Sequence, residues 1–479
     1  MTTAVRPALF HRDVVGFTIL AVIAIRLVPM ATATGPSVMT LWPLAAILFF
    51  APVSMASVIL SRHLPSTGGI YVWSKTAFGD LHGFITAWTY WSSVLVFFPS
   101  VLLFTSSQAA FIVPGHQHLA ESQTFLNSIS IVSVVVLLLL NLAGMRVATW
   151  YHNISALTKF VIVAMVIGLA TVSWMRFGSA TDFSTVSWVP SFGGLKDLLF
   201  FSSIIYMFSG AESSSQLGDE VHEAHRTIPR ALVNAGLLIT LIYLTTSLSL
   251  LTAVPANELS GLKGFATAVS ISAHRLGGDS FGQWTTSGVS ILLFVGHLGT
   301  VSVWLATTAR LPFVIGLDRY LPASFGRLHP RFGSPYVALI TLAVATMMLI
   351  VLSSLGGAAE QVYHALISLE IAIYFIPYLY LFAALIKLQA TGALNDAQQT
   401  PIKKCGRYVI AAIGFVVTAT SLVLALIPGE NVESPAQFYV MVFGSLAFNL
   451  VIGAGLYLWG KRTRPRDIAV PGIVAIETT

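Results

Sequence analysis

Four charged residues interrupt long apolar stretches of this 479-residue sequence, and they are the first candidates for chemistry. Each of these stretches is otherwise of membrane-spanning character, and the residues are Arg26, Lys159, Glu212 and Glu370. Because a charge in hydrocarbon is costly, such side chains pair with one another or line a pathway for an ion, a proton or a polar solute. Two cations and two anions predict internal pairing with a role in coupling or gating. The alternative is that they only hold helices together.

The stretch around Arg26 also carries signals that break a helix. Pro29 removes a backbone donor and clashes with the preceding turn, and Gly35-Pro36 interrupts regular winding again. We expect the peptide groups between these signals to bind a substrate; the residues are Met30, Ala31, Thr32, Ala33 and Thr34.

A second break is predicted in the segment YMFSGAESSSQLGDE. Ser209 and Gly210 lie where an apolar helix should continue, and a glycine without Cβ lets the backbone approach a ligand. We expect Tyr206 and Phe208 to cover that ligand and Glu212 to begin the next half-helix, where an anion is favoured. The alternatives are ordinary helix packing for the aromatic residues and small-residue helix contacts for the serines.

The composition and the apolar segments define the expected fold. With 56% hydrophobic and 9% charged residues, the chain has too few polar groups to cover a water-soluble protein. The segments are too long for barrel strands and long enough to cross a bilayer as helices. The sequence therefore predicts an all-α integral membrane protein with twelve transmembrane helices, at 14–34, 37–61, 81–111, 126–145, 153–175, 197–218, 230–254, 284–310, 336–355, 361–387, 408–427 and 438–460.

The two predicted breaks fall in the first and sixth of these segments. Paired broken helices at corresponding positions of two halves are typical of transporters built from inverted repeats. We therefore expect a single transmembrane domain over 1–479, in which a 5+5 inverted repeat with broken helices 1 and 6 occupies 14–390 and two additional helices occupy 408–460.

The positions of Lys and Arg predict the orientation. If the N-terminus is cytoplasmic, 19 of the 25 Lys and Arg residues fall in cytoplasmic segments and four on the opposite side. Positive charge marks cytoplasmic loops. The bias predicts a multi-pass protein of the inner (cytoplasmic) cell membrane with both termini in the cytoplasm.

Several function classes lack support in the sequence. There is no Walker-type nucleotide motif, no soluble domain of folding size, and no clustered set of His, Asp or nucleophilic residues at one membrane depth, so we expect neither an enzyme nor a cofactor or metal site. The basic balance is explained by the loops and predicts no nucleic-acid partner. Three other polar residues within or near spans, Asn141, His297 and His364, are interpreted as structural.

Three sets of motifs resemble the amino acid–polyamine–organocation (APC) superfamily of permeases. Gly210-Ala211-Glu212, then Gly218-Asp219-Glu220 and Pro229-Arg230, are similar to its sixth-span signature. Pro65-x-x-Gly68-Gly69-x-Tyr71-x-Trp73 and Leu317-Asp318-Arg319-Tyr320-Leu321-Pro322 resemble its loops after spans 2 and 8.

The first span departs from the superfamily pattern. In place of the usual Gly-Ser-Gly-Ile-Phe it has residues 29–35, and together with Arg26 it looks closer to the bacterial glutamate/γ-aminobutyrate antiporter branch.

The resemblance also implies a role for Lys159. In several APC transporters a lysine of span 5 replaces the sodium ion that relatives of this fold hold between spans 1 and 8. In that place the Lys159 ammonium donates to carbonyls of the broken first span, either as a proton carrier or as a fixed tether. The resemblance thereby implies coupling to protons or to exchange.

These observations predict a secondary active transporter, a permease for amino acids that works by proton symport or as an antiporter. Its expected partners are a small amino acid or amine, membrane lipid and protons, and it is expected to be a monomer or homodimer. One alternative is a polyamine or amine importer of the same superfamily, which requires more acidic side chains at the site. Outside transport, the alternatives are a channel or a membrane sensor.

Overall fold

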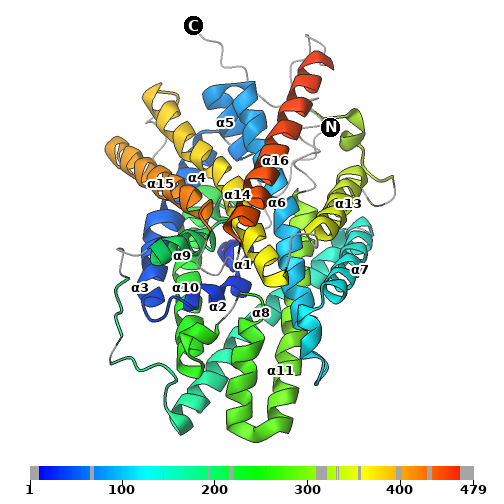
Figure 1. Ribbon diagram of the computed structural model, residues 1–479. Coiled ribbons are helices and arrows are strands. Elements are labelled where there is room, and N and C mark those ends of the chain that lie inside the picture. Colours follow the sequence, from blue (N-terminus) through cyan, green and yellow to red (C-terminus); the bar gives the residue numbers. More distant parts are fainter. Residues whose placement is uncertain are drawn as a thin grey trace.

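The protein is built of helices in every part that the structure describes. The computed structural model describes residues 10–64, 69–143, 145–184, 186–190, 195–214, 221–259, 261–308, 321–330, 332, 334–353, 358–394, 402–428 and 434–463. Within these ranges the regular elements are helices and no strand occurs (Figure 1). Eleven helices there are long and apolar enough to cross a membrane. The predicted all-α membrane fold is confirmed.

Nine long helices form the body of the molecule within the described ranges. They are α6 (Asp80–Ala109), α7 (Gln123–Leu142), α8 (Met145–Phe177), α10 (Ala224–Ala253), α11 (Gly264–Thr308), α13 (Tyr336–Ser353), α14 (Ala359–Ala390), α15 (Lys404–Ala425) and α16 (Pro435–Thr463). The second span consists of α3 (Val38–Ala45) and α4 (Ala51–His63), joined by one π-helical turn, and α5 (Ile70–Phe78) follows it. Helix α11 bends at Gly278, where φ is 74°, so only its second part corresponds to the predicted eighth span.

The first span is broken, but earlier than the sequence suggests. Helix α1 (His11–Val22) ends before the non-helical residues Ile23 and Ala24, and winding resumes in η1 (Ile25–Leu27) and α2 (Val28–Thr32). Pro29 lies at the start of α2, where its missing N–H and fixed φ suit a helix beginning. The proline therefore opens the second half-helix instead of interrupting it.

The sixth span is broken where it was expected. Helix α9 (Leu195–Tyr206) ends in a turn at residues 207–210, in which Gly210 has a φ of 107°, and a short 3-10 turn follows at 211–214. At 12 residues, α9 is too short to count among the eleven membrane-crossing helices. The total of twelve spans and the inverted repeat stay predictions. The signature residues Asp219 and Glu220 lie outside the described part, as do Pro65–Gly68 and 317–320 of the loop motifs.

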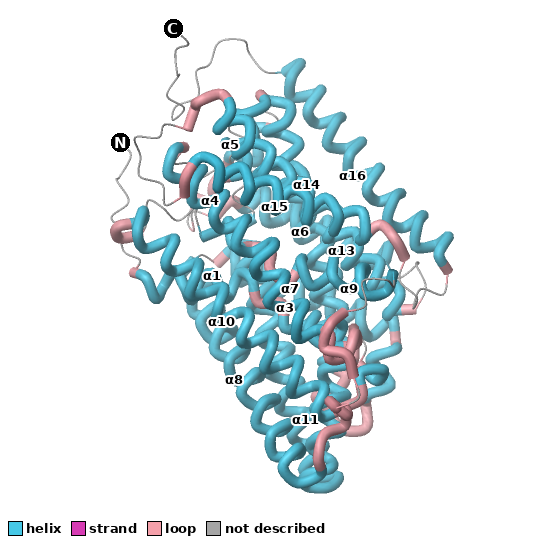
Figure 2. Tube along the Cα trace, turned by 90° about the vertical axis from the view of Figure 1, so that its left-hand side faces the viewer, coloured by secondary structure: helices cyan, strands magenta, loops and turns pink. Residues whose placement is uncertain are grey.

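In the part of the chain that the structure describes, five long helices, α6, α8, α10, α11 and α14, surround these two breaks. Helix α1 packs on α10, α14 packs on α6, and α11 packs on both α6 and α8. The views in Figures 1 and 2 agree that α5 lies at one end of the molecule and the bend of α11 at the other. Helix α16 lies on the outside and exposes apolar side chains such as Val440 and Val451, as expected for a surface that faces lipid.

Small residues allow α8 and α11 to approach closely. A Cβ added at Gly296 would lie 2.5 Å from Thr158 Oγ1, and one at Gly299 would lie 1.8 Å from Ser155 Oγ. Close approach through small residues is a usual form of membrane helix packing. It holds the part of α8 that carries Lys159 against the part of α11 that carries His297.

Candidate substrate-binding site

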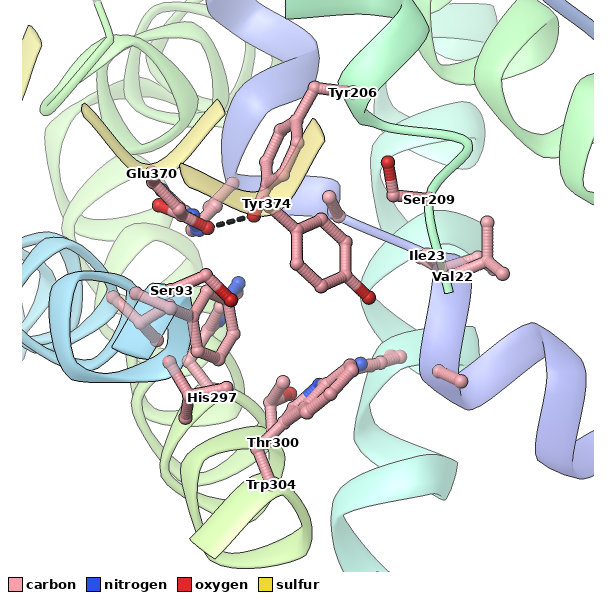
Figure 3. Close-up of a pocket in the computed structure, with 17 residues that line it drawn as sticks. Val22, Ile23, Ser93, Tyr206, Ser209, His297, Thr300, Trp304, Glu370 and Tyr374 are labelled. Atoms are coloured by element: carbon pink, nitrogen blue, oxygen red, sulfur yellow. Dashed lines mark hydrogen bonds and ion pairs between the residues drawn. The ribbon is translucent and has the colours of Figure 1, made fainter. Parts of the chain in front are cut away.

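A cavity lies between the two helix breaks and the helices that enclose them (Figure 3). The first break contributes backbone and side chains from residues 21 to 26, the second contributes two side chains, and α6, α8, α11 and α14 contribute the rest. The lining residues are Ala21, Val22, Ile23, Ala24, Arg26, Ser93, Val94, Phe97, Val101, Lys159, Tyr206, Ser209, His297, Thr300, Trp304, Glu370 and Tyr374.

The break in the first span leaves peptide groups without helical partners. The last carbonyls of α1 receive no hydrogen bond from a helical N–H, because the helix ends there. They also form the negative end of its dipole. Lys159 Nζ donates to the Leu20 carbonyl at 3.5 Å. The ammonium of Lys159, which is buried, therefore lies at the end of the first half-helix, as the resemblance implied.

Tyr243 of α10 joins the two breaks through its hydroxyl group. It accepts from the Ala24 N–H at 3.0 Å, and it lies 2.9 Å from the Met207 carbonyl, to which it donates. One hydroxyl thereby replaces a helical hydrogen bond in each broken span. The two unwound segments are held together by a side chain from neither of them.

The second break presents a free hydroxyl to the cavity. Ser209 is 8% exposed, lines the cavity, and its Oγ has no hydrogen-bond partner within the described part of the chain. The neighbouring Gly210 lies against the first break, because a Cβ there would be 3.1 Å from the Ala21 carbonyl oxygen. Its N–H donates to Tyr378 of α14 at 2.8 Å. A buried, unpartnered hydroxyl next to a close backbone contact is a ready point for a polar ligand.

Arg26 and Glu370 form a buried ion pair on one side of the cavity. Both are nearly inaccessible to solvent, and Arg26 Nη2 lies 3.3 and 3.2 Å from the two carboxylate oxygens. Ser100 donates to the carboxylate at 2.9 Å, Tyr206 also donates to it, and Arg26 donates to Tyr363 at 3.2 Å. Figure 3 shows Tyr206 reaching from the second break to Glu370. The predicted pairing of charges inside the membrane thus occurs for these two residues.

Glu212 is surrounded by tyrosine hydroxyl groups. It is completely buried and accepts from Tyr90 and Tyr374 at 3.1 Å each and from Tyr378 at 2.6 Å. Tyr374 lines the cavity, so Glu212 lies behind it. Three donated hydrogen bonds compensate for much of the lost hydration of a carboxylate.

Comparison with known proteins identifies the family. The model of the family described as "Amino acid permease" matches residues 9–453. The chain belongs to this amino acid permease family. The permease is 28% identical to an uncharacterized transporter of Legionella pneumophila, over 90% of this chain and 92% of the relative.

Two more relatives of the permease have names that state a substrate. A "probable agmatine/putrescine antiporter" of Lactococcus lactis is 23% identical over 91% of this chain and 92% of its own length. A "glutamate/gamma-aminobutyrate antiporter" of the same species is 22% identical over 83% and 80%. These names support the predicted superfamily and its transporter character.

The structure brings five of the thirteen predicted site residues of the permease to one cavity. Arg26, Lys159, Tyr206, Ser209 and Glu370 line the cavity. Gly210 and Glu212 lie directly behind its wall, as described above.

The remaining predicted residues point elsewhere. Phe208 is buried among the rings of Trp42, Phe50 and Tyr243. The residues of the run 30–34 lie along α2 and its end, outside the cavity lining, and Thr32 donates to Ser247 instead.

Sequence reasoning did not select several residues that line the cavity. Ser93, Thr300 and Trp304 carry no charge and interrupt no helix, so nothing in the sequence separates them from ordinary span residues. The sequence interpretation gives His297 a structural role, although a histidine at membrane depth is itself a sign of function. Tyr374 lies one turn after Glu370, and that spacing could have placed it on the same face of α14.

Proposed function

We propose that the permease is a secondary active transporter that carries amino acids across the cytoplasmic membrane. The observation that supports this most strongly is the meeting of two broken helices at one cavity, where carbonyls, N–H groups and the unpartnered Ser209 hydroxyl surround a space lined by both charge signs. Such a site suits a small zwitterion because a regular helix would leave no backbone groups for it.

We propose a binding mode that follows from the polarity of these groups. The substrate ammonium donates to the carbonyls that end α1 and to those around the second break, with Glu370 close by. The carboxylate lies toward the N–H groups that follow Ala24 and toward the free hydroxyl of Ser209. This arrangement replaces the peptide groups at 30–34 of the sequence prediction with those at 21–26.

Two clusters suit the role of gates on opposite sides of the substrate. With the N-terminus in the cytoplasm, α1 enters from that side, so Arg26 lies beyond the break toward the exterior. We propose that Arg26, Glu370 and Tyr206 close the outer side, and that Glu212 and its tyrosines close the inner side. Opening either side then requires a broken span to move, which couples each gate to the substrate.

Lys159 supports coupling without sodium. Its ammonium already lies at the carbonyl end of α1, where it supplies a positive charge that a bound cation would otherwise supply. We propose that transport is coupled to protons or to counter-substrate. Lys159→Ala should abolish or uncouple uptake, and normal pH-dependent uptake by this variant would remove the role.

Uptake into liposomes tests the proposed function. Purified protein is reconstituted, the vesicles are loaded with unlabelled amino acids or amines, and entry of labelled substrate is measured with and without a pH gradient. We expect counter-flow of at least one amino acid. Ion conduction without exchange of any solute would instead support a channel.

Two observations favour the alternative of a polyamine or amine transporter. The permease resembles a relative named for agmatine and putrescine, and Glu370 and Glu212 both flank the cavity region. However, both carboxylates already have partners, so a dication would have to displace Arg26 or the tyrosines. Exchange of putrescine but of no amino acid would establish this alternative.

A further inference from the structure

The cavity has a second wall opposite the helix breaks. It is built by α6 and α11, and Figure 3 shows Ser93, His297, Thr300 and Trp304 on the side away from Val22, Ile23 and Ser209. If the breaks hold the ammonium and carboxylate of an amino acid, this wall meets its side chain. The chemistry of the wall therefore bears on which amino acid is carried.

Three side chains of this wall, those of Ser93, His297 and Thr300, turn their polar hydrogens toward their own helices. Ser93 donates to the Tyr90 carbonyl at 2.7 Å, and Thr300 donates to the Gly296 carbonyl at 3.2 Å. His297 Nδ1 lies 2.8 Å from the Leu293 carbonyl. A carbonyl oxygen only accepts, so Nδ1 carries the proton and Nε2 of the neutral ring is an acceptor. Each of the three side chains bonds to its own helix and leaves lone pairs for a ligand.

Of these acceptors, His297 Nε2 has the strongest need for a hydrogen-bond donor. Its side chain is 4% exposed, its ring packs 4.9 Å from that of Phe104, and Nε2 has no hydrogen-bond partner in the part of the chain that the structure describes. A ligand that supplies a donor to Nε2 gains a hydrogen bond in the cavity, and a ligand without one does not.

The charges around the cavity are matched before a ligand enters. Arg26 is paired with Glu370, Glu212 accepts three tyrosine hydroxyls, and Lys159 lies at the negative end of the α1 dipole. A ligand with a net charge would leave that charge unmatched in a membrane interior. The cavity therefore favours a ligand of zero net charge.

We propose that the substrate is a neutral amino acid whose side chain carries a hydrogen-bond donor, a hydroxyl or a carboxamide, and that this donor bonds to His297 Nε2. An acidic side chain brings further acceptors to those of Ser93, His297 and Thr300 and adds an unmatched charge, and an aliphatic side chain leaves Nε2 unpaired. A cationic side chain brings donors but adds an unmatched charge. This proposal rests on the proposed amino acid transport and specifies its substrate class.

Competition between amino acids of equal shape tests the proposal. Reconstituted protein takes up a labelled substrate while unlabelled threonine or valine, and asparagine or leucine, compete. The members of each pair have the same number and branching of heavy atoms, and only one of them carries a side-chain donor. We expect the donor-bearing member to compete about tenfold better in each pair, and asparagine to compete better than aspartate. Equal or reversed ratios, including a preference for aspartate or lysine, would overturn the substrate class.

A histidine variant locates the effect. His297→Leu should reduce the threonine-to-valine ratio toward one, while the matched control His116→Leu, at an exposed position, should keep the wild-type ratio. An unchanged ratio in His297→Leu would overturn the role of Nε2. If His297→Leu is not stable, the threonine-to-valine ratio of Thr300→Val and the competition ratios of the wild type still test the proposal. Absence of exchange with every amino acid would contradict the proposed function itself.

Discussion

At the scale of single residues, hydroxyl groups stabilise the buried carboxylates of this membrane protein by donating hydrogen bonds to them. The carboxylate of Glu370 accepts from Ser100 and Tyr206 besides Arg26, and Glu212 accepts from three tyrosines. A hydroxyl donates a hydrogen bond without adding a charge, so it offsets lost hydration and leaves the net charge of the site unchanged. Charged residues can therefore lie near a substrate, because these hydrogen bonds offset the free energy lost when the charges leave water.

The Arg26–Glu370 pair gives a prediction on stability. Glu370→Gln leaves the Arg26 charge buried and unpaired, which typically costs about 3–5 kcal/mol. We expect a clear fall in the thermal unfolding midpoint of the purified protein in detergent. The double variant Arg26→Leu/Glu370→Leu should regain much of the stability but not transport. The exposed carboxylate variant Glu258→Gln serves as the control.

If Glu370→Gln unfolds at the wild-type temperature, the ion pair contributes little to the folded state. Its role would then be restricted to transport, and the same preparation tested in the uptake assay would show this.

At the scale of elements, two kinds of residue produce the two breaks. In the first span, Pro29 starts a half-helix, and the non-helical residues precede it. In the second, Gly210 adopts a φ of 107° and lets the backbone approach the Ala21 carbonyl. The break at Gly210 therefore depends on the absence of a side chain, both for its conformation and for its contact.

Substitution of this glycine tests the element. Gly210→Ala forces an L side chain into a conformation that costs about 1–3 kcal/mol and brings Cβ within 3.1 Å of the Ala21 oxygen. We expect transport to fall at least about tenfold while the protein still inserts in the membrane. Gly168→Ala is the matched control, because that glycine lies within α8 and a Cβ there meets nothing within 4 Å.

Wild-type uptake by Gly210→Ala would show that the second break needs no close approach of backbones. The contact between Gly210 and Ala21 would then have no part in the binding of the substrate.

At the scale of the whole molecule, the arrangement of helices is consistent with the predicted sidedness. The bend of α11 and the helix α5 lie at opposite ends of the molecule, as expected for segments on opposite sides of a membrane (Figures 1 and 2). Cys405 is exposed at the beginning of α15, in the loop region that the Lys and Arg distribution places in the cytoplasm.

The single cysteine allows a direct test of orientation. A thiol reagent that does not cross membranes should leave Cys405 unlabelled in intact spheroplasts and label it in inside-out vesicles. The control Cys405→Ser/His118→Cys moves the thiol to an exposed position on the other predicted side and should reverse the pattern. Labelling of Cys405 from outside would invert the topology and exchange the two gates.

The fold class followed from the sequence because the bilayer leaves few choices. Long apolar segments must be helices in lipid, and charges within them must meet partners, so Arg26, Lys159, Glu212 and Glu370 stood out by type alone. Gly210 was also recognisable from the sequence, because a Ser-Gly pair is not expected in the middle of an apolar helix. Tyr206 and Ser209 followed from their closeness to that glycine in the chain.

Only the tertiary structure decided which groups actually face one cavity. Pro29 signals both a helix break and a helix start. In the structure it starts α2, which packs against α10, and the unwound residues are Ile23 and Ala24. Phe208 and Tyr206 have the same local character, yet one turns into aromatic packing and the other to Glu370. His297, Ser93 and Thr300 form one wall only because α6 and α11 pack side by side. The sequence determines the chemistry of each side chain, but the surrounding helices determine which neighbours it contacts and where its polar hydrogen points.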